Sequence, residues 1–201
     1  MFPNQTLTNP WAQTEVDTTV FGSTKLQTNG LGKTTGSGKN TISMLVQAMA
    51  LSGPTLPQLT PGGNITGVFH VVTADGAGPI SAVLDSTASG QFAAGVPLPV
   101  LEQIPGDKGN FVAAKKTQNR SLWGRAMEGL GLVRKRGAAN VNQSFAFAFS
   151  VPEGTVCNGT VAGMTGVCLV KIANANKAGP FGGVVPVQMA GNAAAACGKA
   201  V

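Results

Sequence analysis

The stretch SFAFAFS, residues 144–150, predicts a β-strand with one buried face. Phe145, Phe147 and Phe149 alternate with small or polar residues, and successive side chains of a strand point to opposite faces of a sheet. The three phenyl rings therefore share one face, which a second layer of structure must cover. The stretch predicts an antiparallel sheet that packs over a core on one side.

Other segments extend this pattern. Runs rich in β-branched residues, bounded by turn-forming residues, predict further strands at 64–73, 80–85, 96–101, 155–157, 167–173 and 183–189. One segment differs, because in TISMLVQAMALSG, residues 41–53, the apolar side chains recur at helical spacing and Gly53 and Pro54 end the run. We expect one short helix over residues 41–52.

The segment before this helix, GLGKTTGSGKNT at residues 30–41, looks at first like a phosphate-binding loop. Such a loop needs about four residues between its first glycine and the sequence Gly-Lys-Ser/Thr. Five residues separate Gly32 from Gly38, and Asn40 follows Lys39 where a hydroxyl is required. We interpret the segment as a flexible connector.

Composition limits both fold and function. A chain of 201 residues with 28 glycines and 12 prolines favours short strands joined by turns in a single domain, residues 1–201. We predict a mainly β protein with an immunoglobulin-like antiparallel β-sandwich. The chain has no tyrosine, one histidine and eight carboxylates, so catalysis by acids, bases or nucleophiles has few groups available. The longest apolar runs are too short for a membrane span.

The segment 113–140 is strongly basic and predicts a long exposed loop. It holds seven of the fourteen basic residues and a single acid, Glu128. The seven are Lys115, Lys116, Arg120, Arg125, Arg134, Lys135 and Arg136. Two other interpretations stay open, a patch that binds an anionic surface and a cleavage site at the dibasic pair. Nucleic acid is the weakest of the anionic partners, because no base-stacking aromatics alternate with the charges.

Two features of the sequence favour an extracellular protein. Five sequences fit the acceptor pattern for N-glycosylation, at Asn4, Asn64, Asn119, Asn142 and Asn158. Cys157 and Cys168 flank NGTVAGMTGV, a glycine-containing turn between two apolar runs. This arrangement predicts a hairpin with a disulfide across its strands, and two buried free thiols are the alternative.

Four strings together resemble the fungal Egh-sixteen-like family of secreted virulence factors, which includes appressorium-specific cell-surface proteins. They are NPWAQTEVDTTVF (9–21), TLPQLTPGG (55–63), HVVTADGAGP (70–79) and VPEGTVCNGTVAGMTGVCLVKIANANKAGPFGGVVPVQMAG (151–191). The resemblance implies an extracellular or surface-displayed fungal protein associated with virulence, without a settled enzymatic activity. It also leads us to expect that the family's leader and the first part of its mature chain are missing ahead of Met1.

A second analogy concerns copper. The histidine at the start of HVVTADGAGP and the aromatic residue of AGPFGG are similar to features of lytic polysaccharide monooxygenases, which hold copper with two histidines beside an axial aromatic ring. The analogy makes His70 a metal ligand and Phe181 its axial neighbour. A single histidine cannot close a copper site, so copper and oxidation of polysaccharide belong only to a full-length form with an N-terminal histidine.

The sequence therefore predicts a binding protein that has no catalytic residues in this form. The leading ligand is polysaccharide of a cell wall or cuticle, or another component of the host surface, and this choice rests on analogy of fold. The other interpretations of the two residues are structural: His70 ends a strand, and Phe181 packs over a turn. We expect Asp75 and Asn174 to form turns, and His70 and Phe181 to lie on neighbouring strands of one closed, double-layered sheet.

Overall fold

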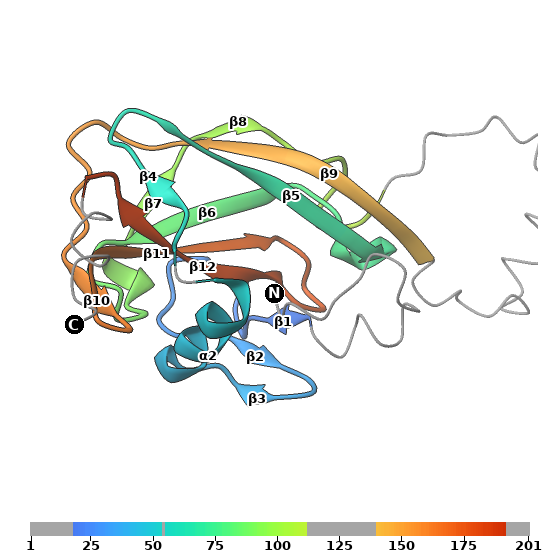
Figure 1. The fold of residues 1–201 in the computed structure, drawn as a ribbon. Helices are drawn as coiled ribbons and strands as arrows, with labels where there is room; N and C mark the ends of the chain where they lie inside the picture. The colour runs from blue at the N-terminus through green and yellow to red at the C-terminus, as the bar shows by residue number, and fades with distance from the viewer. Residues whose placement is uncertain (1–17, 54, 112–139, 192–201) are drawn as a thin grey trace, which may run out of the picture.

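The computed structural model describes residues 18–53, 55–111 and 140–191, which form two antiparallel layers of β-structure and one α-helix. The main sheet has nine strands, and a smaller sheet of three strands covers one of its faces (Figure 1). The predicted mainly β, antiparallel sandwich is confirmed. The more specific immunoglobulin-like arrangement stays a prediction.

The main sheet has the order β3-β2-β1-β12-β11-β6-β7, with β10 beside β11 and β4 beside β12. Every pair is antiparallel except β4 with β12. The strands are β1 (Thr19–Val20), β2 (Lys33–Thr34), β3 (Gly38–Lys39), β4 (Gln58–Leu59), β6 (Ile80–Asp85), β7 (Val96–Leu98), β10 (Gly159–Val161), β11 (Met164–Asn174) and β12 (Phe181–Met189). The 3-10 turns η1 (Ala74–Gly76) and η2 (Phe92–Ala94) follow β5 and β6.

The smaller sheet has the order β5-β9-β8 and carries the phenylalanine-rich stretch in its central strand. Its strands are β5 (Asn64–Thr73), β9 (Asn140–Ser150) and β8 (Val100–Glu102). Phe147 and Phe149 belong to the core between the sheets, and Phe145 packs against it. The prediction that the three rings share one buried face is confirmed.

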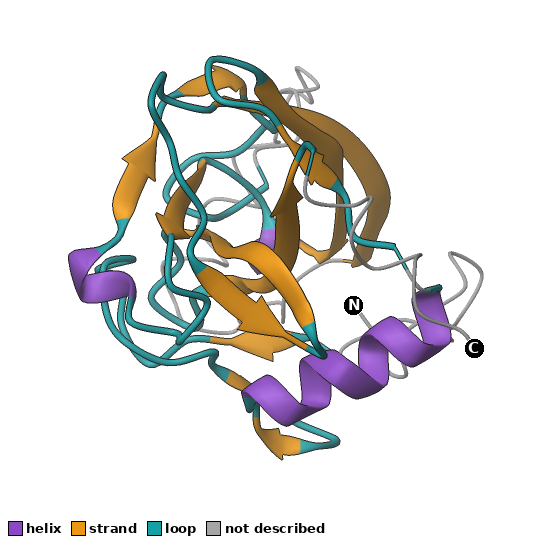
Figure 2. Ribbon diagram, turned by 60° about the vertical axis from the view of Figure 1, so that its left-hand side comes forward, coloured by secondary structure: helices purple, strands orange, loops and turns teal. Residues whose placement is uncertain are grey.

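The main sheet is buried on both faces. Between the sheets lies a core that includes Ile80, Phe149 and Val170. On the opposite face a second core includes Phe92 and Leu169, and the helix α2 (Ile42–Ser52) lies over this side (Figures 1 and 2). Because β11 is covered on both sides, its sequence is an almost continuous apolar run.

Three local predictions were wrong. The strand expected at 96–101 is interrupted at Pro99, and its two parts, β7 and β8, belong to different sheets. Residues 155–157 form no strand. The strand of this region is β10, which starts two residues after Cys157. The expected connector at residues 30–41 contains the hairpin β2–β3, which Asn40 fastens by donating to the Leu31 carbonyl at 3.2 Å. The predicted helix over 41–52 is confirmed as α2. The basic segment 113–140 lies almost wholly outside the described residues.

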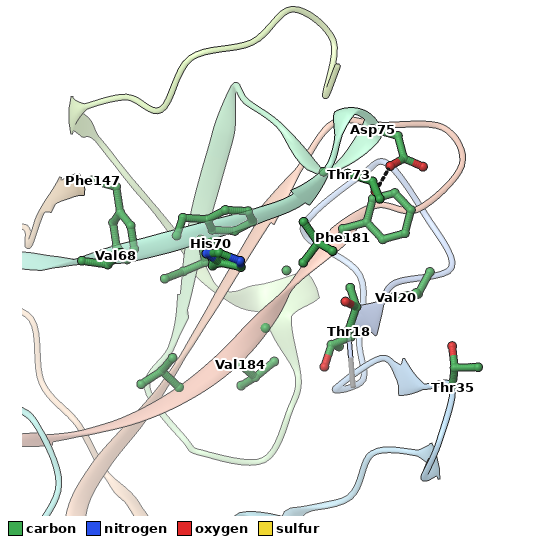
Figure 3. Close-up of a pocket in the computed structure, with 18 residues that line it drawn as sticks. Thr18, Val20, Thr35, Val68, His70, Thr73, Asp75, Phe147, Phe181 and Val184 are labelled. Atoms are coloured by element: carbon green, nitrogen blue, oxygen red, sulfur yellow. Dashed lines mark hydrogen bonds between the residues drawn. The ribbon is translucent and has the colours of Figure 1, made fainter. Parts of the chain in front are cut away.

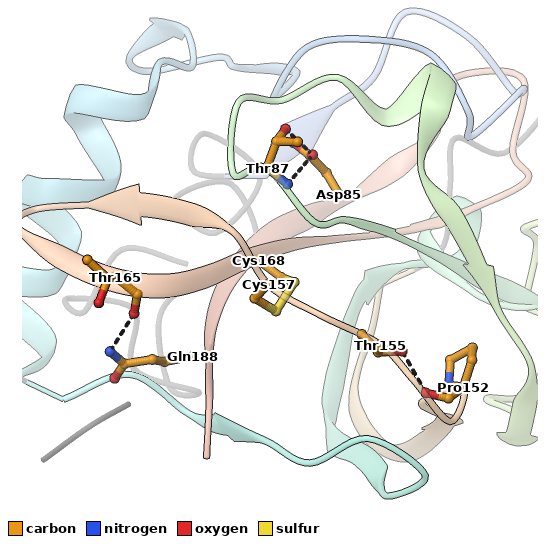
Figure 4. Close-up of a disulfide and its surroundings, with 8 residues drawn as sticks. All are labelled: Asp85, Thr87, Pro152, Thr155, Cys157, Thr165, Cys168 and Gln188. Atoms are coloured by element: carbon orange, nitrogen blue, oxygen red, sulfur yellow. Dashed lines mark hydrogen bonds between the residues drawn. A yellow bond between two sulfur atoms is a disulfide. The ribbon is translucent and has the colours of Figure 1, made fainter. Parts of the chain in front are cut away.

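The predicted disulfide is confirmed. Cys157 and Cys168 are bonded, with their Cα atoms 5.0 Å apart, and the bond lies in the interior next to the hairpin β10–β11 (Figure 4). The bond therefore joins the segment before β10 to the central strand of the main sheet. No helix among the described residues is long and apolar enough to cross a membrane.

Candidate functional site

A cavity of about 460 Å³ opens where β5 of the smaller sheet faces β12 and β1 of the main sheet (Figure 3). Consecutive residues of both long strands line it, 68–70 from β5 and 181–185 from β12. Consecutive side chains of a strand point to opposite faces. The cavity is therefore bordered by the edges of these strands and not by one face of a sheet.

The cavity has two chemically different ends (Figure 3). Thr18, Thr35, Thr73 and Asp75 form the polar end, together with the half-buried ring of Phe181. Val68, Phe147, Val184 and Val185 form the apolar end. No lysine or arginine is among the described residues that line the cavity. The site therefore disfavours an anionic ligand and suits one that has an apolar surface.

Asn174 fixes the position of Phe181. Its Oδ1 accepts a hydrogen bond from the Phe181 backbone N–H at 2.9 Å, and its Nδ2 donates to the carbonyls of Asp75 at 3.1 Å and Ala77 at 3.0 Å. Asn174 is buried, so these bonds join the turn after β5 to the turn before β12. Its Oδ1 also accepts from the Asn176 backbone N–H two residues later, at 3.3 Å, which confirms the predicted turn-forming role of Asn174.

Asp75 also acts within its turn. Its carboxylate accepts a hydrogen bond from the Thr73 hydroxyl, which lies two residues earlier (Figure 3). The predicted position of Asp75 in a turn is confirmed, since it lies in η1, although its carboxylate bonds a side chain and not the backbone. The same residue lines the polar end of the cavity.

Both ring nitrogens of His70 are engaged by neighbouring side chains of β9. Nε2 lies 3.0 Å from Oδ1 of Asn142, and Nδ1 lies 2.9 Å from the Ser144 hydroxyl. An amide oxygen only accepts, so Nε2 donates to Asn142, and Nδ1 shares a hydrogen bond with the Ser144 hydroxyl. The contacts fix the ring on the outer side of the smaller sheet, which agrees with a structural role.

The described residues do not fit a copper site. A metal would have to replace one of the two hydrogen bonds that hold the His70 ring. In the described ranges no three histidine, cysteine, aspartate or glutamate side chains are grouped so that they could hold a metal ion. We therefore derive no chemistry through copper.

The predicted relation between His70 and Phe181 was wrong in one respect. His70 is in β5 of the smaller sheet and Phe181 is in β12 of the main sheet, so they are not on neighbouring strands of one sheet. Both residues nevertheless line the same cavity. The two segments come together because the sheets face each other.

The sequence interpretation missed Lys171, a lysine that is only 1 % exposed in β11. Its ammonium lies 4.8 Å and 4.5 Å from the ring centroids of Phe21 and Phe92, and donates to the carbonyls of Thr28 at 2.6 Å and Leu26 at 3.4 Å. Burial lowers the pKa of Lys171 to about 8. The sequence signal that could have indicated this buried lysine is its position inside the apolar run VCLVKIA, residues 167–173.

Asp85 is a second buried charge that the sequence did not reveal. Its carboxylate accepts hydrogen bonds from the backbone N–H and the hydroxyl of Thr87 (Figure 4). It also accepts from the backbone N–H groups of Ser89, Gly90 and Gln91. Burial raises the pKa of this carboxyl, but the hydrogen bonds lower it further, so the net pKa lies below its ordinary value. Asp85 therefore organises the loop that follows β6.

The other predicted sites divide between described and undescribed residues. Asn64, Asn142 and Asn158 have exposed side chains, as a glycosylation acceptor needs; Asn4 and Asn119 lie outside the described residues. All seven basic residues of the predicted patch, Lys115 to Arg136, also lie outside them. Glycosylation at the five asparagines and binding by the basic patch stay predictions.

Fold and site define a disulfide-bonded β-sandwich protein with a cavity between the edges of its two sheets. The chain belongs to the Egh16-like virulence factor family, whose sequence profile matches residues 3–182. It is 36% identical over 167 residues to the appressoria-specific virulence factor GAS1 of Pyricularia oryzae, which covers 83% of this chain and 55% of that protein.

A second relative supports the same family. The chain is 36% identical over 130 residues to the appressoria-specific virulence factor GAS2 of Pyricularia oryzae, covering 65% of this chain and 37% of that protein. The chain thus spans about half the length of GAS1 and less of GAS2. No solved structure matches it.

Proposed function

We propose that this member of the family acts outside the fungal cell or on its surface, by binding polysaccharide of a cell wall or cuticle without catalysis. The observation that supports this proposal is the polar end of the cavity. There the ring of Phe181 is accompanied by the side chains of Thr18, Thr35, Thr73 and Asp75.

This combination suits a neutral sugar. The C–H faces of a sugar ring stack on an aromatic ring, while hydroxyl and carboxylate groups at its rim take part in hydrogen bonds with the sugar hydroxyls. The absence of lysine and arginine from the described lining disfavours an acidic polymer in this cavity. Because Asn174 already holds the backbone of Phe181 in place, this part of the site needs little backbone ordering when a ligand binds.

A retention assay tests the proposal. The purified protein is mixed with insoluble chitin, cellulose and β-glucan, and the bound fraction is measured for the unsubstituted chain, Phe181→Ala and the control Val100→Ala. We expect retention on at least one polymer, a several-fold loss for Phe181→Ala and none for the control, whose residue is exposed on β8.

Two results would contradict the proposal. If Phe181→Ala is retained as well as the unsubstituted chain, the cavity is not the binding site. If the protein binds none of the polymers, polysaccharide is not its ligand. A third variant with Arg134, Lys135 and Arg136 changed to glutamine separates the contribution of the basic segment. If that variant alone loses binding, polysaccharide binds through the basic segment and not at Phe181.

A further inference from the structure

We propose that the same cavity binds an extended polypeptide segment of another molecule, which adds a strand to the open edge of β5. Among the described residues, β5 pairs with β9 on one side and with no strand on the other. This proposal concerns the apolar end of the cavity, and it does not depend on sugar binding at the polar end.

The register shows which backbone groups of β5 face the open edge. Ser150 of β9 donates its N–H to the Pro99 carbonyl at 2.8 Å, on the side away from β5. Asn64, which lies opposite Ser150, is therefore in a non-hydrogen-bonded pair. The register is continuous from Asn64 to Val71, so every second residue of β5 from Asn64 onward turns its backbone away from β9.

Three of these residues lie along the middle of the strand. Thr66, Val68 and His70 each direct an N–H and a C=O toward the open edge, and Val68 and His70 line the cavity. Groups facing one side of a strand recur about every 6.8 Å. An extended polypeptide has its own N–H and C=O groups at this same spacing, so it can form successive hydrogen bonds with these backbone groups of β5.

The opposite wall of the cavity also has an open stretch. Gln188 donates its backbone N–H outward to the Pro57 carbonyl at 2.9 Å, so Pro186 and Val184, two and four residues earlier, turn their backbones to the same side. On the side of β12 that faces away from β11, no described strand pairs with it between Gly182 and Gln188. Proline has no N–H, so this stretch is a poorer partner for a strand than β5.

β5 is also the least protected of the described edges. Strands β3 and β4 have two residues each, and the three-residue strands β7 and β8 contain Pro97 and Glu102. Short length, proline and charge are the usual features that prevent an edge from pairing. β5 has ten residues, NITGVFHVVT, without a proline, lysine, arginine or carboxylate.

The shape and chemistry of the cavity favour a single extended segment. Val68 is 64% exposed on the face of β5 that also carries His70, and Val185, opposite Val170 of the core between the sheets, is 40% exposed. Apolar side chains on the two faces of a bound segment can pack against them. Two walls enclose about 460 Å³. A single extended chain fits between these walls. The β5 strand of a second copy of the protein does not fit as well, because the rest of its sheet would have to enter the cavity too.

Selection from a library of random twelve-residue peptides displayed on phage provides the probe. The enriched peptide is synthesised, and its Kd is measured for the unsubstituted chain, Val68→Pro and Val68→Ala. Val68→Pro removes an N–H that faces the edge without touching the β9 ladder, and Val68→Ala keeps that N–H. We expect binding at least about tenfold weaker for Val68→Pro, the effect of one lost hydrogen bond, and little change for Val68→Ala.

Circular dichroism and thermal melting must first show that Val68→Pro is folded. If it is not, methylation of alternate backbone nitrogens of the peptide tests the same bonds from the ligand side.

The proposal is overturned if no peptide is enriched, if Val68→Pro or the methylated peptide binds as well as the original, or if Val68→Ala alone abolishes binding. A dimer seen by sedimentation and dissociated by Val68→Pro would assign the edge to a second copy. Loss of polysaccharide retention with Val68→Pro would instead assign the open edge of β5 to a sugar ligand.

Discussion

The ammonium group of Lys171 lies 4.5 Å from the centroid of the Phe92 ring, inside the core between the main sheet and α2. It also donates to the Thr28 carbonyl at 2.6 Å. Lys171 thereby fastens the segment that follows β1, and β1 forms part of the cavity wall. A buried charge in this position gives the stability of the protein a specific dependence on pH.

Stability is expected to rise between pH 8 and pH 10.5. Burial lowers the pKa of Lys171 from 10.5 to about 8, so in this interval the unfolded chain binds more protons than the folded chain. The free energy of unfolding therefore increases with pH, by at most about 1.4 kcal/mol per pH unit from this group. Denaturant unfolding across the interval measures the slope, and Lys171→Met should abolish it. An unchanged slope in Lys171→Met would contradict this assignment.

Asp85→Asn is expected to destabilise the protein by about 2–3 kcal/mol, the effect of losing hydrogen bonds to a charged group. The new amide would direct N–H groups at backbone N–H groups of the loop after β6. Because the folded pKa of Asp85 is lowered, its contribution is present above the ordinary carboxyl pKa of 3.8 and is lost as the pH falls through the folded pKa. Asp107→Asn, at an exposed position, is the control in denaturant unfolding. Equal stability of the two variants would disprove the role of Asp85.

The disulfide between Cys157 and Cys168 is expected to contribute about 3 kcal/mol, because it closes a short loop in the unfolded chain. The double substitution Cys157→Ala and Cys168→Ala should lower the unfolding free energy by this amount. A reducing agent should have a similar effect on the unsubstituted chain and none on the double variant. Stability that does not respond to either change would show that the bond is not formed in solution.

Gly67→Ala is expected to cost about 1–3 kcal/mol, the usual effect of forcing an extra carbon into a packed site. A Cβ atom at Gly67 would lie 2.7 Å from the Phe147 ring, so the ring would have to move. Gly22→Ala is the matched control, because nothing lies within 4 Å of its added carbon. Thermal unfolding compares the two, and equal melting temperatures would mean that Phe147 does not rest on Gly67.

The sequence predicted those elements whose side chains repeat with a regular period. The alternation of Phe145, Phe147 and Phe149 gave the central strand of the smaller sheet, and helical spacing gave α2. The strands predicted at 64–73 and 80–85 agree with β5 and β6. Cys157 and Cys168 could be paired because the turn between them brings the segment before β10 next to β11.

The features that were missed depend on contacts between distant segments. Strands of two residues, such as β1 and β4, are too short to show any period. The cavity exists because the edge of β5 faces β12, and their side-by-side placement is a property of the sheet order. The burial of Lys171 results from coverage of β11 on its second face, which alternation within one strand does not reveal.

The central claim is that the cavity between β5 and β12 is the binding site. Two-dimensional amide NMR of the folded chain, titrated with short soluble oligosaccharides of chitin and β-glucan, tests it most directly. The account predicts shifts that saturate and are largest at Phe181, Thr73 and Gly182, with none at Val96 on the distant strand β7. Saturable shifts concentrated at β7 or in the basic segment, with Phe181 unaffected, would contradict it.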